Sequence, residues 1–370
     1  MIYKDLLKGA KPSLLGFGCM RFPTDKDGKI DREESKRLID YAFKNGVNYF
    51  DTAYMYHDGE SQDFLGEVLE EYPRDSFYIT NKLPVWMTDS PEAADAIFEE
   101  QLKRCRVDFF DFYLVHSVTA ENFKKIKEYD VVTMLEKKRS EGKIKHLGFS
   151  FHDSPELLKE FVAYHKWDFG QIQLNYLDWD MQRAKEQYEI LEQNNIPCVV
   201  MEPVRGGALA DLGEKGNAIL KKSEPDKSIA SWAIRYVASM PNVMTVLSGM
   251  SNFEQTVDNI NTVSENKLIT DKDKEILKSA LNEYLSKEPI ECTGCRYCMD
   301  CPAGVDIPLM FKMYNEYKQS GNKEEYLSKY NATEDNKKAF NCVSCGKCSE
   351  NCPQKINIPD KLKSISIITA

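Results

Sequence analysis

Short apolar runs rich in β-branched and aromatic residues alternate with amphipathic helical patterns along residues 1–287. Helical patterns such as residues 31–46, with acidic residues in the first turn and Asn-Gly at the end, carry the usual signals of a helix start and stop. Strands that alternate with helices are typical of parallel sheets in which each helix connects two strands. The predicted strands cover residues 14–20, 47–52, 77–83, 110–116, 145–151, 169–175, 197–203 and 242–249.

The number and regularity of these units favour a closed α/β barrel. A doubly wound open sheet would also alternate strands and helices. Eight regular units, with no Gly-x-Gly-x-x-Gly pattern after the first strand, favour a (β/α)8 TIM barrel instead. A further helix is predicted over residues 271–285, packed outside the barrel. We place a domain boundary near residue 287, with the barrel over 1–287 and a small, mainly α-helical domain over 288–370.

Composition narrows the class of protein. Of the 370 residues, 42% are hydrophobic and 29% charged, which excludes wholesale disorder. The formal net charge is −10 with no basic cluster, so nucleic-acid binding, which depends on clustered cations, is disfavoured as the main role. The sequence has no apolar leader run and no stretch of about 20 uncharged apolar residues. We therefore expect a cytoplasmic protein that does not span or bind a membrane.

Eleven cysteines are distributed unevenly along the chain. Cys19, Cys105 and Cys198 lie singly within apolar or helical runs, where we expect buried, small apolar side chains. The other eight lie between residues 292 and 352, in the motifs CTGCRYCMDCP and CVSCGKCSENCP. In a cytosolic protein thiols stay reduced, so this density indicates metal ligation rather than disulfides.

The spacing of these eight cysteines predicts two [4Fe–4S] clusters. Three cysteines separated by two-residue gaps wrap one cluster, and the fourth, which precedes a proline, ligates the other cluster. Zinc is the alternative, but it usually takes separated Cys-x2-Cys pairs rather than two runs of four. The predicted ligands are Cys292, Cys295, Cys298 and Cys352 for one cluster, and Cys342, Cys345, Cys348 and Cys301 for the second.

Ionisable residues stand at the carboxyl ends of three successive predicted strands. Asp51 ends the second strand, Lys82 the third and His116 the fourth, and Tyr56 follows in the loop after Asp51. Active residues of TIM barrels come from these strand ends, so we expect the four side chains to converge on one rim. The alternative is a structural ion pair between Asp51 and Lys82, with the other two side chains packed at the rim.

Such a set could reduce a carbonyl group by hydride transfer. Tyr56 would donate the proton that the developing alkoxide needs, and its reference pKa of about 10 requires electrostatic tuning. We expect the Lys82 cation to lower that pKa and Asp51 to hold the lysine in place. His116 would orient the carbonyl and donate a hydrogen bond to its oxygen.

Four segments resemble successive motifs of the aldo-keto reductases: GVNYFDTAYMY (46–56), FYITNKL (77–83), FYLVHS (112–117) and KIKHLGFS (143–150). The resemblance runs along nearly all of residues 1–287. It implies a (β/α)8 barrel closed at the bottom by an N-terminal hairpin, and a nicotinamide cofactor bound extended across the top. It also implies that Asp51, Tyr56, Lys82 and His116 form the catalytic tetrad.

The resemblance further implies cofactor-binding residues. Ser150 and Gln171 match the pair that hydrogen-bonds the nicotinamide carboxamide, while Phe151 stands where many members have asparagine. Met201 replaces the aromatic residue that commonly stacks on the nicotinamide ring. Met250 occupies a position where some branches carry a basic residue for the 2′-phosphate, so NADP and NAD both stay open.

Two loops complete the implied cofactor site. The loop PVRGG (203–207) would cover the pyrophosphate, with an ordinary glycine turn as the alternative. Residues 247–259 resemble the adenosine-phosphate segment, which opens a helix, and helix N-termini suit phosphate. The residues concerned are Pro203, Arg205 and Gly206 in the first loop, and Gly249, Ser251, Gln255 and Asn259 in the second.

The C-terminal region resembles the α-helical dicluster ferredoxin module. Its halves repeat each other, since CPAGVDIP (301–308) echoes CPQKINIP (352–359), and Asp306 and Asn357 are predicted helix N-caps. About forty residues of mainly helical type separate Cys301 from Cys342, more than a compact βαβ ferredoxin leaves between its motifs. The whole chain therefore resembles the iron–sulfur-containing branch of the aldo-keto reductases.

Two functions stay open. The first is NAD(P)H-dependent hydride transfer to a small carbonyl compound, or the reverse from an alcohol, with Tyr56 as acid and base. The second is ferredoxin-linked electron transfer with a flavin at the barrel mouth and a ferredoxin or flavoprotein as redox partner. Nicotinamide exchanges electrons in pairs, whereas each cluster passes one electron at a time. Electron transfer between the two therefore needs a cofactor, such as a flavin, that can do both. The alternative is that the clusters have a structural or sensory role. A regulatory subunit, like the reductase-fold subunits of potassium channels, would leave the tetrad idle.

Overall fold

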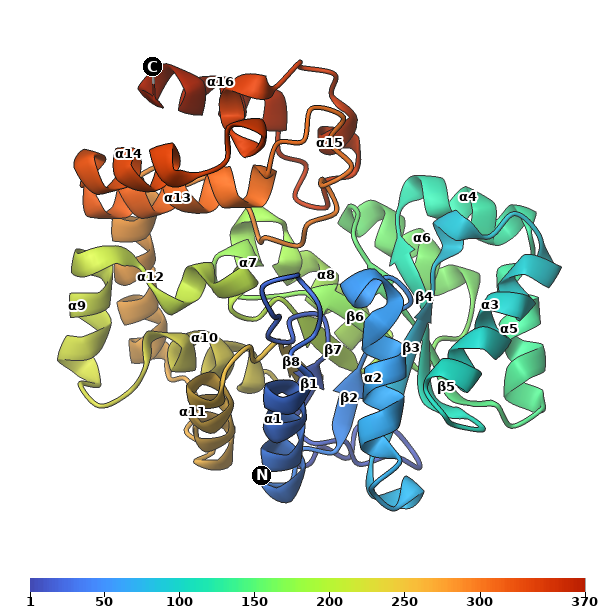
Figure 1. The fold of residues 1–370 in the computed structure, drawn as a ribbon. Coiled ribbons are helices and arrows are strands. Elements are labelled where there is room, and N and C mark those ends of the chain that lie inside the picture. The colour runs from blue at the N-terminus through green and yellow to red at the C-terminus, as the bar shows by residue number, and fades with distance from the viewer. Residues whose placement is uncertain (370) are drawn as a thin grey trace. The chain divides into compact units, whose positions relative to one another are not determined.

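Eight parallel strands close a barrel in sequence order, and β8 pairs with β1 (Figure 1). The structure is a computed structural model that describes residues 1–369. Each predicted strand is present, and the predicted (β/α)8 barrel is confirmed. The strands are β1 (Leu15–Gly18), β2 (Tyr49–Asp51), β3 (Tyr78–Leu83), β4 (Phe110–Val118), β5 (Ile144–Phe151), β6 (Phe169–Gln173), β7 (Cys198–Met201) and β8 (Val243–Ser248).

Helices follow the strands and continue into the C-terminal region. In the first 269 residues they are α1 (Arg32–Lys44), α2 (Glu60–Leu69), α3 (Pro91–Arg104), α4 (Ala120–Glu128), α5 (Val131–Ser140), α6 (Pro155–Tyr164), α7 (Asp178–Met181), α8 (Ala184–Gln193), α9 (Gly213–Ser223), α10 (Ile229–Ala238) and α11 (Phe253–Ser264). The later ones are α12 (Asp271–Leu285), α13 (Ile307–Ser320), α14 (Lys323–Ala332), α15 (Lys347–Glu350) and α16 (Ile358–Thr369). Short 3₁₀ turns are η1 (Tyr56–Gly59), η2 (Arg74–Ser76), η3 (Val85–Met87), η4 (Arg205–Ala210), η5 (Asp335–Lys337) and η6 (Ala339–Asn341).

Local capping explains where several helices begin. The Asp31 side chain accepts a hydrogen bond from the backbone N–H of Glu34 at the start of α1. Thr270 and Asp273 form a capping box at the start of α12, which spans the predicted range 271–285. These hydrogen bonds satisfy backbone donors that have no partner inside the helix, so the chain enters the helix at a defined residue.

Large apolar side chains fill the end of the barrel where the strands begin. Tyr49, Phe112, Phe169 and Met244 form one buried cluster there, and Ala10 packs against them. Antiparallel bridges Tyr3↔Ser13 and Leu7↔Ala10 form the N-terminal hairpin that supplies Ala10. This end of the barrel is therefore a packed core, which leaves the carboxyl ends of the strands for chemistry.

The chain divides into two compact units of dense internal contact. Unit 1 comprises Met1–Pro203 and Ala233–Ile269, and unit 2 comprises Val204–Trp232 and Thr270–Ala370. In unit 2, α9 packs on α12 and α13, so the segment after β7 joins the C-terminal region. These compact units do not test whether the chain folds as two separate domains, so the predicted domain boundary near residue 287 stays a prediction.

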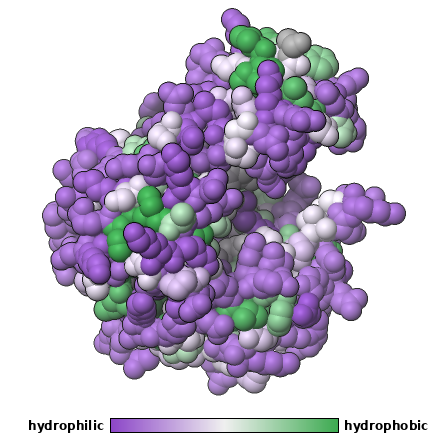
Figure 2. Space-filling view, turned by 90° about the vertical axis from the view of Figure 1, so that its left-hand side faces the viewer, coloured by the Kyte–Doolittle hydropathy of each residue, from purple (hydrophilic) through white to green (hydrophobic). Residues whose placement is uncertain are grey.

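Unit 2 has its own apolar core. Val305, Met310, Phe311 and Ile365 are fully buried in it, and the cysteines of both motifs pack around the same cluster. Asp306 is the N-cap of α13, as predicted, and its side chain accepts from the N–H of Leu309. Within residues 1–369, no helix combines the length and apolarity needed to cross a membrane. The face drawn in Figure 2 is mostly hydrophilic, with apolar residues in separate patches.

Candidate active site and cysteine cavities

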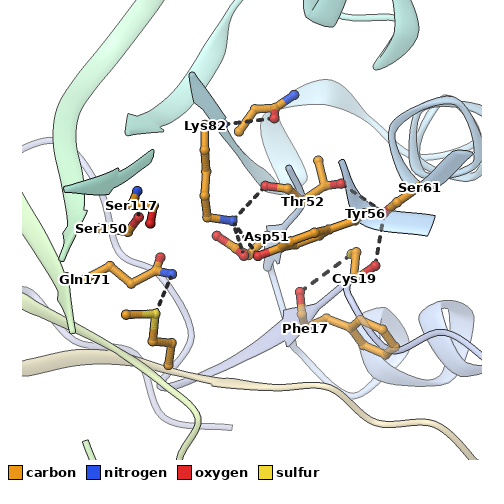
Figure 3. Close-up of polar contacts among 12 residues, drawn as sticks. Phe17, Cys19, Asp51, Thr52, Tyr56, Ser61, Lys82, Ser117, Ser150 and Gln171 are labelled. Atoms are coloured by element: carbon orange, nitrogen blue, oxygen red, sulfur yellow. Dashed lines mark hydrogen bonds and ion pairs between the residues drawn. The ribbon is translucent and has the colours of Figure 1, made fainter. Parts of the chain in front are cut away.

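The buried Lys82 side chain contacts three residues at the barrel rim, Asp51, Thr52 and Tyr56. Lys82 on β3 donates from Nζ to Asp51 Oδ1 at 2.6 Å and to the Thr52 carbonyl at 2.8 Å (Figure 3). Its third contact is with the Tyr56 hydroxyl at 3.4 Å. Lys82 and Asp51 are both buried. An ammonium group has three protons, so each proton has an acceptor in this arrangement.

Tyr56 and His116 complete the group that the sequence predicts at the rim. Tyr56 starts η1 after β2, is partly buried, and its ring centroid lies 4.9 Å from Lys82 Nζ. The His116 ring, on β4, lies 6.5 Å from the Tyr56 ring at an interplanar angle of 83°. Trp86 in η3 also packs on His116, with ring centroids 5.0 Å apart. The structure thus brings the four predicted side chains together on one rim.

The electrostatics of Tyr56 differ from the sequence prediction. Burial raises the pKa of its phenol well above the usual value, and the charges of Asp51 and Glu202 raise it further. Lys82 was expected to lower this pKa, but its charge is already compensated by Asp51 at 2.6 Å. At neutral pH the phenol is protonated, as an unperturbed tyrosine also is, and the raised pKa makes it a weaker acid until a substrate oxygen accepts its proton.

Burial also fixes the charge state of the neighbouring groups. It lowers the pKa of His116 well below the usual value, with the charges of Lys82 and His152 acting in the same direction, so the imidazole is neutral. His116 Nδ1 is buried and has no hydrogen-bond partner among residues 1–369. Burial raises the pKa of Asp51 and lowers that of Lys82, and each partner's charge opposes the shift of the other.

A buried amide network that the sequence did not predict holds the end of β3. Asn81 Oδ1 accepts from Gln62 Nε2 at 3.2 Å, from Gln101 Nε2 at 3.0 Å and from the Lys82 backbone N–H at 2.9 Å. Gln101 Nε2 also donates to the Lys82 carbonyl at 2.8 Å. The network fixes the backbone from which the Lys82 side chain extends. Its members lie on β3, α2 and α3, so no sequence spacing relates them.

An ion pair at the carboxyl end of β7 was also missed. Arg21 Nη2 contacts Glu202 Oε1 at 3.0 Å, and the Arg21 carbonyl accepts from Ser251 Oγ at 2.8 Å. Glu202 has φ of +54° and Ser117, at the end of β4, has φ of +55°. Such left-handed backbone at non-glycine residues is costly and gathers at functional sites. Both residues lie where the barrel presents its loops.

The predicted nicotinamide contacts lie on neighbouring strands. Ser150 on β5 pairs in register with Gln171 on β6, and both side chains are buried. Ser150 Oγ accepts from the Ser117 N–H at 2.8 Å. Gln171 Nε2 donates to Met201 Sδ at 3.6 Å, while its buried Oε1 has no partner in the described part of the chain. An unsatisfied buried carbonyl oxygen fits a ligand amide that would donate to it.

The segment after β8 is held by its own polar side chains. Asn259 Nδ2 donates to Ser248 Oγ at 2.9 Å, and Gln255 Oε1 accepts from the Ser251 N–H at 2.9 Å. A Cβ built on Gly249 would lie 2.9 Å from the Arg21 side chain, so the two segments are in close contact. Met250 is buried. Adenosine-phosphate binding by this segment stays a prediction. The predicted pyrophosphate loop is divided between the two units: Pro203 is the last residue of its stretch of unit 1, and Arg205 and Gly206 belong to unit 2.

The eight clustered cysteines form two groups in unit 2. Cys292, Cys295, Cys298 and Cys352 line one cavity, which we call the cysteine cavity. The pKa of the Cys292 thiol is about 11, raised first by burial and then by the neighbouring Cys295 and Cys352. Burial likewise raises the pKa of Cys298 to about 12. Four thiols that converge on one cavity fit a [4Fe–4S] cluster, which takes four thiolate ligands.

The second group contains the first three cysteines of the second motif and the last cysteine of the first motif. Burial raises the pKa of Cys348, and the nearby thiols of Cys342, Cys301 and Cys345 add to that rise. The structure therefore places the fourth cysteine of each motif with the first three of the other. The remaining three cysteines, Cys19, Cys105 and Cys198, are buried in unit 1, as predicted.

Known proteins resemble both parts of the chain. The aldo/keto reductase family model matches residues 14–282, and a 4Fe-4S dicluster domain model matches residues 291–356. The uncharacterized oxidoreductase YqkF of Bacillus subtilis is 26% identical over 74% of this chain and 94% of its own length. The NADH-specific methylglyoxal reductase of Escherichia coli is 24% identical over 68% of this chain and 89% of its own.

A solved structure supports the fold. Aldo-keto reductase AKR11C1 from Bacillus halodurans, in its holo form, has a TM-score of 0.63 at 24% identity, covering 76% of this chain and 96% of that one. The family match covers the barrel and the rim that carries Asp51, Tyr56, Lys82 and His116. The chain belongs to the aldo/keto reductase family and is an aldo-keto reductase-like oxidoreductase with a C-terminal 4Fe-4S dicluster domain.

Proposed function

We propose that the barrel catalyses NAD(P)H-dependent reduction of a small carbonyl compound, or the reverse oxidation of an alcohol, with Tyr56 as acid and base. The observation that carries this proposal is the position of the Lys82 ammonium between the Asp51 carboxylate at 2.6 Å and the Tyr56 hydroxyl at 3.4 Å. A purely structural ion pair would not need a phenol at that distance on a partly exposed rim.

Ser150 and Gln171 are the side chains that would hold a nicotinamide carboxamide. The partnerless Gln171 Oε1 supports this assignment, because a bound amide would satisfy it. A reduced nicotinamide held by these two side chains would supply the hydride for the carbonyl carbon. The buried Met250 offers no positive charge for a 2′-phosphate, so both NADH and NADPH belong in the assay.

The residues of the rim would manage the proton. Tyr56, protonated at neutral pH, donates its hydroxyl proton to the carbonyl oxygen as the carbon accepts the hydride. The phenolate left behind lies 3.4 Å from the Lys82 ammonium, which stabilises it until solvent returns a proton. The neutral His116 ring donates a hydrogen bond to the same oxygen and aligns the carbonyl.

The test is anaerobic oxidation of NADH and NADPH by the full chain with a carbonyl panel. Methylglyoxal is the first substrate to try, because the E. coli relative is named for it. Tyr56→Phe should lower kcat by about 10²- to 10⁴-fold, the usual contribution of a general acid. Tyr54→Phe is the matched control, because Tyr54 lies in the same loop but donates to Glu100 at 2.8 Å. Unchanged turnover in Tyr56→Phe would reject the role.

The dicluster domain favours a second candidate function, electron exchange with a partner protein. Cys345, predicted to ligate the second cluster, is exposed, which would bring that cluster close to solvent. Because a hydride carries two electrons and a cluster passes one, this function requires a converter such as a flavin at the barrel mouth. Analysis of the anaerobic protein for iron, sulfide and organic cofactor tests it. Absence of flavin, with clusters that neither NAD(P)H nor substrate reduces, would count against it.

A further inference from the structure

The segment that follows β7 has an unusual backbone. Arg205, Gly206 and Gly207 have φ of +51°, +64° and +97°, so three consecutive residues adopt left-handed conformations. Glycine tolerates this region, but arginine does so at an energetic cost that surrounding contacts must offset. The Arg205 side chain is also buried, with 2% of its surface exposed. A charged group so deeply buried needs partners of its own.

Those partners lie at the cysteine cavity. Arg205 Nη2 donates to Gln354 Oε1 at 3.3 Å, and Gln354 lines the cavity next to Cys352. Thr293, which lines the cavity next to Cys292, lies against Gly206. A Cβ built on Gly206 would lie 1.9 Å from the Thr293 carbonyl oxygen, so only glycine fits there. The segment is therefore packed against both motifs that supply the cavity.

The guanidinium lies beside the wall of the cysteine cavity, because its Nη2 is 3.3 Å from Oε1 of the lining residue Gln354. A buried cation is screened far less than one in water, so its charge acts over a longer range. Arg296 also lines the cavity, but 58% of its side chain is exposed and it pairs with Asp306 at 3.8 Å. Arg205 thus brings a buried positive charge to this site, and Arg296 brings a solvent-exposed one.

We propose that Arg205 tunes the cluster bound by the cysteine cavity, raising its reduction potential above the value that a neutral side chain at this position would give. One-electron reduction adds one negative charge to the cluster, and a nearby buried cation stabilises that added charge. In the titration below, the electron comes from the reduced mediator, and no proton is transferred. The inference rests on the proposed cluster ligands, and it gives Arg205 a role other than the pyrophosphate contact predicted from the sequence.

The segment also links the cluster to the barrel through the chain. Arg205 lies four residues after Met201, the last residue of β7. The Arg205 side chain donates to Gln354, and the next residue, Gly206, lies against Thr293. Arg205 is therefore a positioning and tuning residue for the cluster, while the adjoining strand end belongs to the reductase rim.

A redox titration of the full-length, cluster-loaded protein tests the proposal. Wild type, Arg205→Gln, Arg205→Lys and Arg296→Gln are titrated anaerobically with mediators, and reduced clusters are followed by electron paramagnetic resonance and visible absorption. Arg205→Gln should shift one of the two cluster transitions to a more negative potential and leave the other in place. Arg205→Lys should retain most of the wild-type potential, and Arg296→Gln should shift it less than Arg205→Gln does.

Several outcomes would overturn the proposal. They are an unshifted potential in Arg205→Gln, equal shifts in Arg205→Gln and Arg296→Gln, or equal shifts of both clusters. If Arg205→Gln does not assemble the cluster, Gln354→Glu serves instead, because a carboxylate at that position would neutralise the guanidinium and should lower the same potential. A wild-type protein without this cluster would refute the inference together with the cluster ligands. Tyr56→Phe should keep wild-type potentials, so failure of the reductase proposal is distinguishable.

Discussion

Removing the Lys82 ammonium should strongly destabilise the barrel. Lys82→Met keeps the length and apolar volume of the side chain but leaves the buried Asp51 carboxylate uncompensated. Among the described residues, Asp51 Oδ2 has no hydrogen-bond partner, and Lys82, at 2.6 Å from Oδ1, is the cation that pairs with the carboxylate. Breaking a buried ion pair on one side typically costs about 3–5 kcal/mol. That is a large part of the roughly 5–15 kcal/mol by which proteins are stable.

A double variant separates the charge effect from packing. Lys82→Met combined with Asp51→Leu removes both charges, and replacement of buried pairs by apolar residues is often neutral or stabilising. The Thr52 carbonyl still loses its donor at 2.8 Å, a loss of about 1 kcal/mol. The double variant should therefore recover most of the stability lost in Lys82→Met, while both variants stay inactive as reductases.

Urea unfolding followed by tryptophan fluorescence measures this. Of the four tryptophans, Trp86, Trp167 and Trp179 lie in unit 1, so the signal reports mainly on the barrel. A loss below about 1 kcal/mol in Lys82→Met would contradict the charge argument. So would a double variant as unstable as the single one.

The loss in Lys82→Met should also depend on pH. Burial raises the pKa of Asp51 in the folded protein, and Lys82 is the charge that opposes this rise. Without it the folded pKa lies further above the unfolded value of about 3.9. A raised folded pKa favours the fold when the carboxyl is protonated, and this stabilisation is lost as pH rises through that pKa. The deficit should therefore be smaller at about pH 5 than at about pH 8, and a deficit independent of pH would assign it to packing.

Three further predictions test other parts of the molecule. Gly66→Ala should destabilise the protein by about 1–3 kcal/mol in urea unfolding, because its Cβ would lie 2.6 Å from the Arg104 carbonyl oxygen, and a stabilised variant would contradict this contact. Gln171→Ala should weaken NAD(P)H binding by about 2- to 12-fold in a fluorescence titration, the effect of one hydrogen bond, and unchanged affinity would remove Gln171 from the site. Cys352→Ser and Cys292→Ser, although they lie in different motifs, should lose the same cluster signal and about half of the iron, whereas loss of different signals would refute the crossed ligation.

Local patterns explain why the barrel could be predicted from the sequence. Each strand is a short run of buried residues bounded by turn residues, and α12 begins at a capping box written within four residues, Thr270 to Asp273. The convergence of Asp51, Lys82 and His116 follows once the topology is known, because parallel strands of a barrel bring their carboxyl ends to one rim. Cysteine spacing likewise predicts the ligand sets, since the two-residue gaps are set by cluster geometry.

What depends on contacts between distant segments could not be predicted. The Asn81 amide network joins three elements, and polar residues inside helices and strands give no signal of mutual contact. The direction of the Tyr56 pKa shift is set first by burial of the phenol and then by the charges of Asp51 and Glu202, which the fold brings near it. Electrostatic sign is therefore a property of the arrangement rather than of residue types.

Arg205 shows the same limit for a loop. Residues on strands carry over from one family member to another because register fixes where they lie, whereas a loop side chain goes wherever its own contacts place it. In a barrel without an iron–sulfur domain, an arginine after β7 has no cysteine motif to contact. Here Arg205 donates to Gln354, which lines the cysteine cavity, and the neighbouring Gly206 lies against Thr293 of the same cavity. The addition of a cluster domain can therefore reassign a cation of the cofactor loop without any change in the barrel that carries it, and the reduction potential of that cluster is where the reassignment should be visible.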